Sequence, residues 1–125
     1  MMKKIETDFV KFYMENDILI GEFICEKLDL YKAKEILRLR LELTGGTSYK
    51  TCADSTQVKE FTKEARDFMS QGDAYKNISA FAAVTNNSVT RMILNFYLRL
   101  KPHPLPTKLF NNRAAGIDWL KTLDV

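Results

Sequence analysis

The N-terminal part of the chain has the pattern of a β-hairpin. Val10, Phe12 and Met14 alternate with Phe9, Lys11 and Tyr13, which is typical of a strand with two different faces. The polar cluster Glu15-Asn16-Asp17 is typical of a turn, and residues 18–25 resume a β-prone run whose apolar residues do not alternate strictly. We therefore predict a hairpin whose second strand is covered on both faces for part of its length.

An amphipathic helix is predicted to follow the hairpin. Asp29 is a suitable N-cap, and Gly45-Gly46 supplies the signal that ends the helix. Between them, apolar residues recur with the helical period, namely Leu30, Ala33, Leu37 and Leu41, with Ile36 on the flank. The other side carries basic residues that form either a solvated face or a stripe for an acidic partner: Lys32, Lys34, Arg38 and Arg40.

The rest of the chain repeats a strand followed by a helix. The predicted pairs are a strand at 48–53 with a helix from Asp54, a strand at 78–84 with a helix at 89–100, and a strand at 107–110 with a helix capped by Asn111 or Asn112. The helix from Asp54 is predicted from the spacing of Val58, Phe61, Ala65 and Phe68. The strand at 78–84 is predicted to be buried on both faces, because it is apolar apart from one serine.

The order of these elements, β-β-α-β-α-β-α-β-α, defines an α/β fold. Strands that alternate with helices form a mostly parallel sheet, so we predict an open mixed sheet with an N-terminal β-hairpin followed by αβαβαβα. The 125 residues have the length of one domain, which we assign to residues 1–125. In such sheets the loops at the carboxyl ends of the parallel strands carry the site, here Asp54-Ser55-Thr56 and residues 85–88.

Composition excludes several classes of protein. With 46% hydrophobic and 28% charged residues the chain is globular rather than disordered, and its net charge of +3 is too small to indicate nucleic acid as a partner. The longest apolar run, residues 80–84, is far shorter than the roughly 20 residues of a membrane span. The sequence has no signal peptide, and Cys25 and Cys52 are too few for a disulfide framework, so we expect reduced thiols and a cytoplasmic location.

The sequence offers no assembled catalytic set. His103 is the only histidine and lies between two prolines, where a stiff exposed loop is a better interpretation than a general base. Cys52 lies in a predicted buried strand and is interpreted as a small apolar filler rather than a reactive thiol. We therefore expect a protein that is not an enzyme and holds no cofactor or metal. An enzyme that uses Asp54 or Arg91 with a group supplied by the substrate stays open as an alternative.

The start of the second predicted helix carries two polar features. Ser55 lies between a strand and a helix, so its hydroxyl is placed either to cap the helix or to accept a phosphoryl group. Charged residues of both signs then follow at spacings of three and four, which is typical of a solvated face with ion pairs: Lys59, Glu60, Lys63, Glu64, Arg66 and Asp67.

The element order, the Asp54-Ser55 junction and the C-terminal half of the chain carry a resemblance to a known family. The stretches concerned are Phe81-Ala82-Ala83-Val84-Thr85 with Ser88 and Arg91, then Lys101-Pro102, Pro106, Phe110, Ala114 or Ala115, and Trp119-Leu120. These features resemble the STAS domains, the family of bacterial anti-sigma factor antagonists and of the cytoplasmic domains of sulfate transporters. Within this group the chain is similar to the small single-domain SpoIIAA-like proteins, which share a fold with lipid-binding SEC14 domains.

The resemblance implies a regulatory protein. In the antagonists the Asp-Ser pair starts a helix, and a partner kinase that is itself the anti-sigma factor phosphorylates the serine. Carried across, the phosphoacceptor is Ser55, with Thr56 as the other candidate. Two features differ from the family pattern: Thr56-Gln57-Val58 replaces a glycine-containing turn, and the strand before Asp54 is more polar than usual.

Two functions from different classes follow. The first is a non-enzymatic regulatory module that binds another protein, such as a regulatory kinase or an anti-sigma factor, through Asp54, Ser55, Thr56, Lys59, Asn86, Asn87, Ser88 and Arg91. The alternative is a module that binds a small molecule or a lipid, implied by the SEC14-like similarity. A stripe of Met92, Phe96 and Tyr97 is available to such a ligand or simply to the core. A homodimer through the edge strand at 9–14 is also open.

Overall fold

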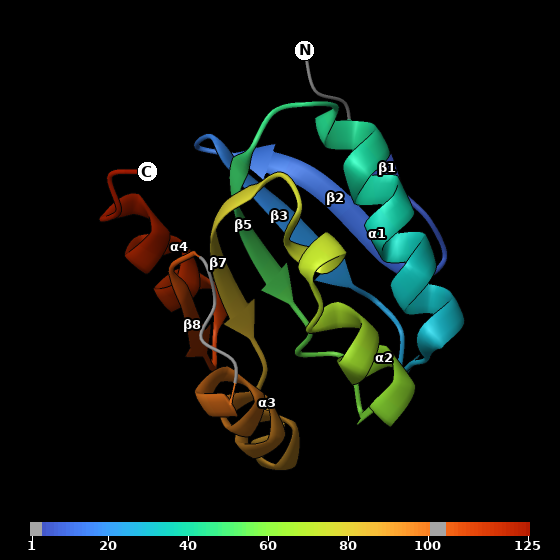
Figure 1. The fold of residues 1–125 in the computed structure, drawn as a ribbon. Helices are drawn as coiled ribbons and strands as arrows, with labels where there is room; N and C mark the ends of the chain where they lie inside the picture. Colours follow the sequence, from blue (N-terminus) through green and yellow to red (C-terminus); the bar gives the residue numbers. More distant parts are fainter. Residues whose placement is uncertain (1–3, 101–104) are drawn as a thin grey trace.

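Six strands form the main sheet of the computed structural model, which describes residues 4–100 and 105–125 (Figure 1). Their spatial order is β1-β2-β3-β5-β7-β8, with the bounds β1 Ile5–Glu6, β2 Val10–Glu15, β3 Ile18–Phe23, β5 Tyr49–Asp54, β7 Ile78–Val84 and β8 Thr107–Phe110. Strand β2 is antiparallel to both of its neighbours, β1 and β3, whereas β3, β5, β7 and β8 run parallel to one another. This is the open mixed sheet with an N-terminal hairpin that the sequence predicts.

The hairpin of β2 and β3 turns at Asn16 and Asp17, which adopt φ angles of 53° and 64°. Asn and Asp tolerate this left-handed region better than other non-glycine residues, so the polar cluster favours the tight turn. Opposite Phe12 in the register lies Gly21. A Cβ atom at Gly21 would be 2.7 Å from Cε1 of Phe12, so the absence of a side chain gives the ring its place over the strand.

Helix α1 (Leu30–Thr44) begins and ends where the sequence predicts. The Asp29 carboxylate accepts a hydrogen bond from the Lys32 amide at 3.0 Å, and Gly45 ends the helix with a φ of 61°. One side chain was assigned to the wrong face: Arg40 is only 5% exposed. It lies seven residues after buried Ala33, about two helical turns, and therefore on the side that meets the sheet.

The predicted helix from Asp54 is wrong for its first part. After β5 the chain forms a turn and then the two-residue strand β6 (Glu60–Phe61), which pairs with β4 (Lys27–Leu28) in a small parallel sheet. Helix α2 begins only at Lys63 and ends at Met69, with Thr62 as its N-cap, and a 3-10 helix η1 (Gly72–Tyr75) follows. Backbone pairing with β4 holds these residues extended, although their apolar spacing is that of a helix.

The C-terminal half has the predicted elements, but β7 is fully buried on one face only, because Ser79, Phe81 and Ala83 on its other face are half-buried. The strands β7 and β8 are followed by helices α3 (Ser88–Leu100) and α4 (Arg113–Lys121). Asn112 caps α4 by accepting a hydrogen bond from the Ala115 amide at 2.8 Å. No helix in the described part of the chain is long and apolar enough to cross a membrane.

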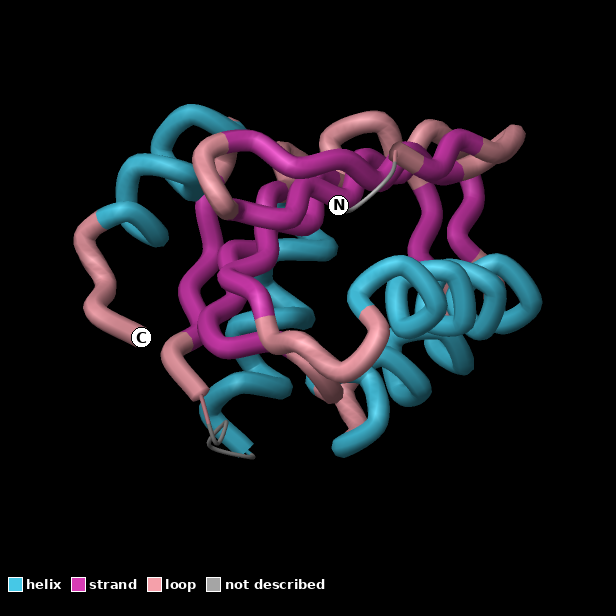
Figure 2. Tube along the Cα trace, turned by 90° about the horizontal axis from the view of Figure 1, so that it is seen from above, coloured by secondary structure: helices cyan, strands magenta, loops and turns pink. Residues whose placement is uncertain are grey.

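The helices lie on the two faces of the sheet in unequal numbers (Figures 1 and 2). Successive parallel strands are added in one direction, and right-handed crossovers then place α1, α2 and α3 on the same face. Helix α4 follows the last strand and packs on the other face, with Ile117 and Leu120 against a core that includes Cys52 and Ala82. We call these the three-helix face and the α4 face.

Candidate functional site

The predicted site residues Asp54 and Ser55 are neighbours in the chain but point to opposite faces of the sheet. Asp54 is the last residue of β5 and lies on the α4 face, where its carboxylate meets Arg113 of α4. Ser55 lines a cavity on the three-helix face. Successive residues of an extended chain alternate between faces, so the junction contributes to two separate regions instead of one. Both side chains are buried, at 6% and 8% exposure.

A polar cluster surrounds Asp54 on the α4 face; we call Tyr13, Glu22, Asp54, Thr56 and Arg113 the Asp54 cluster. The Arg113 guanidinium donates from Nε to Asp54 Oδ2 at 2.9 Å and from Nη1 to the Tyr13 hydroxyl at 2.7 Å. Its Nη2 lies 2.9 Å from carboxylate oxygens of both Glu22 and Asp54. The other Asp54 oxygen accepts from the Thr56 amide at 3.0 Å and the Thr56 hydroxyl at 2.7 Å.

The side chains of the Asp54 cluster form hydrogen bonds and ion pairs with one another. Burial disfavours the charged guanidinium of Arg113, but the hydrogen bond to Asp54 and the charges around it more than offset this and raise its pKa. For Tyr13, in contrast, burial raises the pKa, against the opposing charge of Arg113. Because Asp54 Oδ1 accepts from two donors of Thr56 and Oδ2 lies beside two nitrogens of Arg113, the arrangement favours a structural role that joins β3, β5 and the start of α4.

Sequence reasoning missed Tyr13, Glu22 and Arg113 as partners of Asp54. A signal existed for one of them: Arg113 is the first residue of α4, where the helix dipole disfavours a positive charge. A cation at that position indicates a nearby carboxylate that compensates for the dipole.

On the three-helix face, Ser55 is not the helix cap that one interpretation predicts. Its amide and its hydroxyl both donate to the Val84 carbonyl at 2.8 Å, so the side chain ties β5 to β7. The N-cap of α2 is Thr62, whose hydroxyl accepts from the Ala65 amide. The Ser55 hydroxyl is thus buried and hydrogen-bonded inside the fold.

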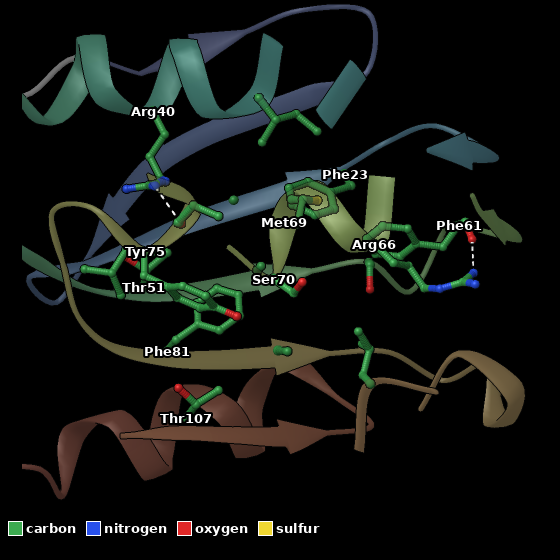
Figure 3. Close-up of a pocket in the computed structure, with 18 of the residues that line it drawn as sticks. Phe23, Arg40, Thr51, Phe61, Arg66, Met69, Ser70, Tyr75, Phe81 and Thr107 are labelled. Carbon is green, nitrogen blue, oxygen red and sulfur yellow. Dashed lines mark hydrogen bonds between the residues drawn. The ribbon is translucent and has the colours of Figure 1, made fainter. Parts of the chain in front are cut away.

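A cavity of about 120 Å³ lies between the sheet and the helices of the three-helix face (Figure 3). Most of its lining is apolar, and the aromatic rings come from β2, β3, the end of β6, η1 and β7. The lining residues are Phe12, Gly21, Phe23, Ile36, Arg40, Thr51, Ala53, Ser55, Phe61, Arg66, Met69, Ser70, Ala74, Tyr75, Ile78, Phe81, Ala83, Leu94, Thr107 and Leu109.

Small residues on the central strands create this space. Gly21, Ala53 and Ala83 are neighbours across β3, β5 and β7 and leave the middle of the sheet uncovered by side chains. The α4 face also has small residues, but there α4 approaches closely. A Cβ atom at Gly116 would be 3.3 Å from the Cβ of Ala82. Small residues are therefore matched by a close helix on one face and leave a cavity on the other.

Two arginines and a tyrosine belong to the cavity wall. Arg40 of α1 donates from Nη1 to the Lys76 carbonyl at 2.6 Å and from Nη2 to the Ala74 carbonyl at 2.9 Å, and its burial lowers its pKa to about 10. Burial raises the pKa of Tyr75 to about 12, and its ring meets that of Phe81 edge to face. Arg66 of α2 was predicted to belong to a solvated ion-pair face. Instead its Nη1 donates to the Phe61 carbonyl (Figure 3).

The other predicted contact residues form a rim at the carboxyl ends of β5 and β7. Thr56 is half-buried, Lys59, Asn86 and Ser88 are exposed, and half-buried Asn87 donates to the Lys59 carbonyl at 3.4 Å. Arg91 is half-buried on α3. Apart from Asp54 and Ser55, the structure therefore brings the predicted loop residues to one region.

Several other predicted features have different outcomes. Lys63 and Asp67 form the expected ion pair at 3.0 Å, whereas Glu60 belongs to β6. Met92 is 65% exposed and does not line the cavity, while His103 and the side chains of Phe96 and Tyr97 lie outside the described residues. Cys52 is fully buried, and burial raises the pKa of its thiol to about 12. In the described residues, no group of three His, Cys, Asp or Glu side chains can hold a metal ion.

Comparison with solved structures identifies the fold. The chain is similar to an uncharacterized protein of the DUF3478 family with a SpoIIAA-like fold from Shewanella loihica PV-4, with a TM-score of 0.64 and 16% identity over 89% of this chain and 91% of that one. The SpoIIAA-like fold that the resemblance implies is therefore confirmed. A protein of unknown function from Arthrobacter sp. FB24 aligns with 19% identity over 90% of this chain and 99% of that one, at a TM-score of 0.35.

Comparison of sequences adds a family but no activity. No curated protein matches the chain. A family model described as "Domain of unknown function (DUF7793)" matches residues 12–124.

Proposed function

This chain belongs to the DUF7793 family, and we propose that it is a non-enzymatic binding module whose cavity on the three-helix face takes a small, largely apolar ligand. The observation that carries the proposal is the cavity of about 120 Å³ between the sheet and α1, α2 and α3. It corresponds to the alternative that the SEC14-like similarity implies. The ligand would contact the rings of the wall and the small residues at the centre of the sheet.

The size of the cavity supports a ligand. Protein interiors are close-packed, with few voids larger than a water molecule. This cavity is partly open to solvent, so part of its apolar wall is hydrated in the free protein, and covering that wall with an apolar ligand is favourable. Apolar cavities of about 150 Å³ bind benzene. A cavity of this size therefore fits an apolar group about as large as a benzene ring.

The chemistry of the polar residues supports a role without catalysis. The Asp54 carboxylate accepts hydrogen bonds on both oxygens, and the raised pKa of Cys52 keeps its thiol protonated and unreactive near neutral pH. Neither group is therefore prepared for general-base or nucleophilic chemistry.

A titration with benzene, followed by NMR of the backbone amides, tests the proposal. We expect saturable shifts at cavity residues such as Ala53 and Phe81 in the wild type. Ala83→Leu should abolish them, because the larger side chain extends from β7 into the cavity that Ala83 lines. The matched control is Ala114→Leu at an exposed position of α4, which should bind as the wild type does. If amides of the wild-type cavity do not respond to benzene, the proposal is wrong.

A second candidate is a protein-binding role at the rim formed by Thr56, Lys59 and residues 86–88. Two exposed apolar side chains of α3, Val89 at 59% and Met92 at 65% exposure, lie beside this rim and favour a partner. A double variant, Val89→Lys with Met92→Lys, should lose a specific partner that the wild type retains in a pull-down. Equal retention by both proteins would exclude this surface.

Control by phosphorylation, which the resemblance implies, belongs to this second candidate. Of the two acceptors, Thr56 is favoured, because the Ser55 hydroxyl is buried against Val84. A phosphate on Thr56 would replace the hydroxyl that donates to Asp54 and bring negative charge to the Asp54 cluster. Thr56→Glu should then release the partner, while Thr56→Val should not.

A further inference from the structure

Arg66 has hydrogen-bonding capacity that the protein does not use. Its side chain runs along the cavity wall towards Phe61, whose carbonyl accepts from Nη1 (Figure 3). The Nε atom is buried and has no hydrogen-bond partner among the described residues. A buried donor without an acceptor is unfavourable, so native structures normally supply one. Because Nε has almost no accessible surface in the free protein, an acceptor from outside the chain can pair with it only when the Arg66 side chain shifts towards the cavity.

The cavity wall also carries positive charge without compensation. The two donors of Arg40 that have partners reach only the main-chain carbonyls of Ala74 and Lys76. In the described part of the chain, neither Arg40 nor Arg66 forms an ion pair with a carboxylate. The rest of the lining is mainly apolar, where electrostatic interactions are stronger than in water. An anion in this cavity would therefore be attracted by both guanidinium groups.

Helix α3 contributes a third observation. Nη1 of Arg91 is buried and likewise without a hydrogen-bond partner among the described residues. Arg91 lies three residues before Leu94, on the same side of α3, and Leu94 lines the cavity. Unpaired donors thus occur on two of the helices that enclose the cavity, whereas no buried side-chain atom of the Asp54 cluster lacks a partner.

We infer that the ligand is a small amphipathic anion, with an apolar part about the size of a benzene ring in the cavity and one carboxylate or similar oxyanion beside Arg66. This inference rests on the proposed ligand-binding function and adds the charge of the ligand. The oxyanion would accept from Nε of Arg66 in a charge-assisted hydrogen bond. Arg40 would add attraction without a direct contact.

Two probes of similar size, one anionic and one neutral, test the inference: phenylacetate and 2-phenylethanol. Both place a benzene ring in the cavity, but only the first carries a carboxylate. We expect the wild type to bind phenylacetate at least about tenfold more tightly in NMR titrations at neutral pH, as one charge-assisted hydrogen bond predicts. Arg66→Gln should bring the two affinities close together, and Arg66→Lys should restore part of the preference. Arg38→Gln, on the exposed face of α1, is the matched control and should keep the full preference.

The outcomes separate the inference from the function on which it rests. If the wild type binds the alcohol as tightly as the acid, or if Arg66→Gln keeps the preference, the anionic ligand is wrong while the cavity still binds. If neither probe binds, both proposals fail. Unchanged amide spectra of the free variants away from residue 66 would show that Arg66→Gln folds normally.

Discussion

The two faces of the six-stranded sheet use similar residues and reach different packing. Ala80 and Ala82 on the α4 face are fully buried, because α4 comes close to the sheet at Gly116. Ala53 and Ala83 on the three-helix face are only half-buried, because the cavity lies above them. Residue size alone therefore does not decide whether a face is filled. The distance of the covering helix does.

The polar groups of the two faces also differ, in the hydrogen-bond partners that the chain supplies for them. In the Asp54 cluster, Arg113 reaches two carboxylates and a hydroxyl of its own chain. On the three-helix face, Arg66 has an unpaired donor and Arg40 has carbonyl partners only. The α4 face thus has the properties of a structural core, and the three-helix face has those of a binding region. The following predictions test this division.

The largest effect is expected from replacing Asp54 and Ser55, at the end of β5, by alanine in two separate variants. Asp54→Ala removes one of the two carboxylates that pair with Arg113 and the oxygen that accepts from the amide and the hydroxyl of Thr56, and this loss should cost about 3 kcal/mol of unfolding free energy. Ser55→Ala is the matched control. It removes one hydrogen bond to a carbonyl that still accepts from the Ser55 amide, at a cost of about 1 kcal/mol. Urea unfolding of both variants measures the difference, and equal losses would contradict the division.

Ala82 and Ala83 provide a second matched pair, because they are adjacent on β7 and belong to opposite faces. Ala82→Leu places extra volume against Gly116 and Ile117 and should cost about 1–3 kcal/mol or more. Ala83→Leu extends into the cavity and should stabilise the protein by about 0.5–2 kcal/mol. Thermal and urea unfolding measure both. If Ala83→Leu destabilises the fold as much as Ala82→Leu, the three-helix face is as tightly packed as the other.

Sequence patterns suffice for the elements whose signals are local. The hairpin, α1 and α4 are predictable because Asn16-Asp17, Asp29 and Asn112 provide turn and cap chemistry within a few residues. The region after Asp54 is not predictable in this way. Its extended conformation depends on pairing between β6 and β4, and a two-residue strand far along the chain leaves no periodic pattern.

The candidate site depends even more on contacts between distant residues. The sequence directs attention to Asp54-Ser55, but only the pleat of β5 shows that the two side chains diverge, and only the position of α4 pairs Asp54 with Arg113. The small residues Ala53 and Ala83 are a sequence signal for the cavity. The same signal on the α4 face marks close packing instead, so the pattern alone cannot distinguish a cavity from a tight helix contact.

The smallest effect concerns Cys52, whose thiol lies in the core of the α4 face. Burial raises its pKa from about 9 in the unfolded chain to about 12, so above pH 9 the unfolded state loses a proton that the folded state keeps. The sign is therefore a loss of stability as pH rises, of about 1 kcal/mol between pH 9 and 10. In urea unfolding at pH 8, 9 and 10, Cys52→Ala should remove this loss between pH 9 and 10. The lost packing of the side chain lowers the stability of the variant equally at every pH and does not affect this comparison. Cys25→Ala is the matched control: the pKa of this half-buried thiol is raised less, so the pH dependence should change less. If Cys52→Ala leaves the slope between pH 9 and 10 unchanged, the thiol is accessible to water, and the α4 face is not the closed core that distinguishes it from the three-helix face.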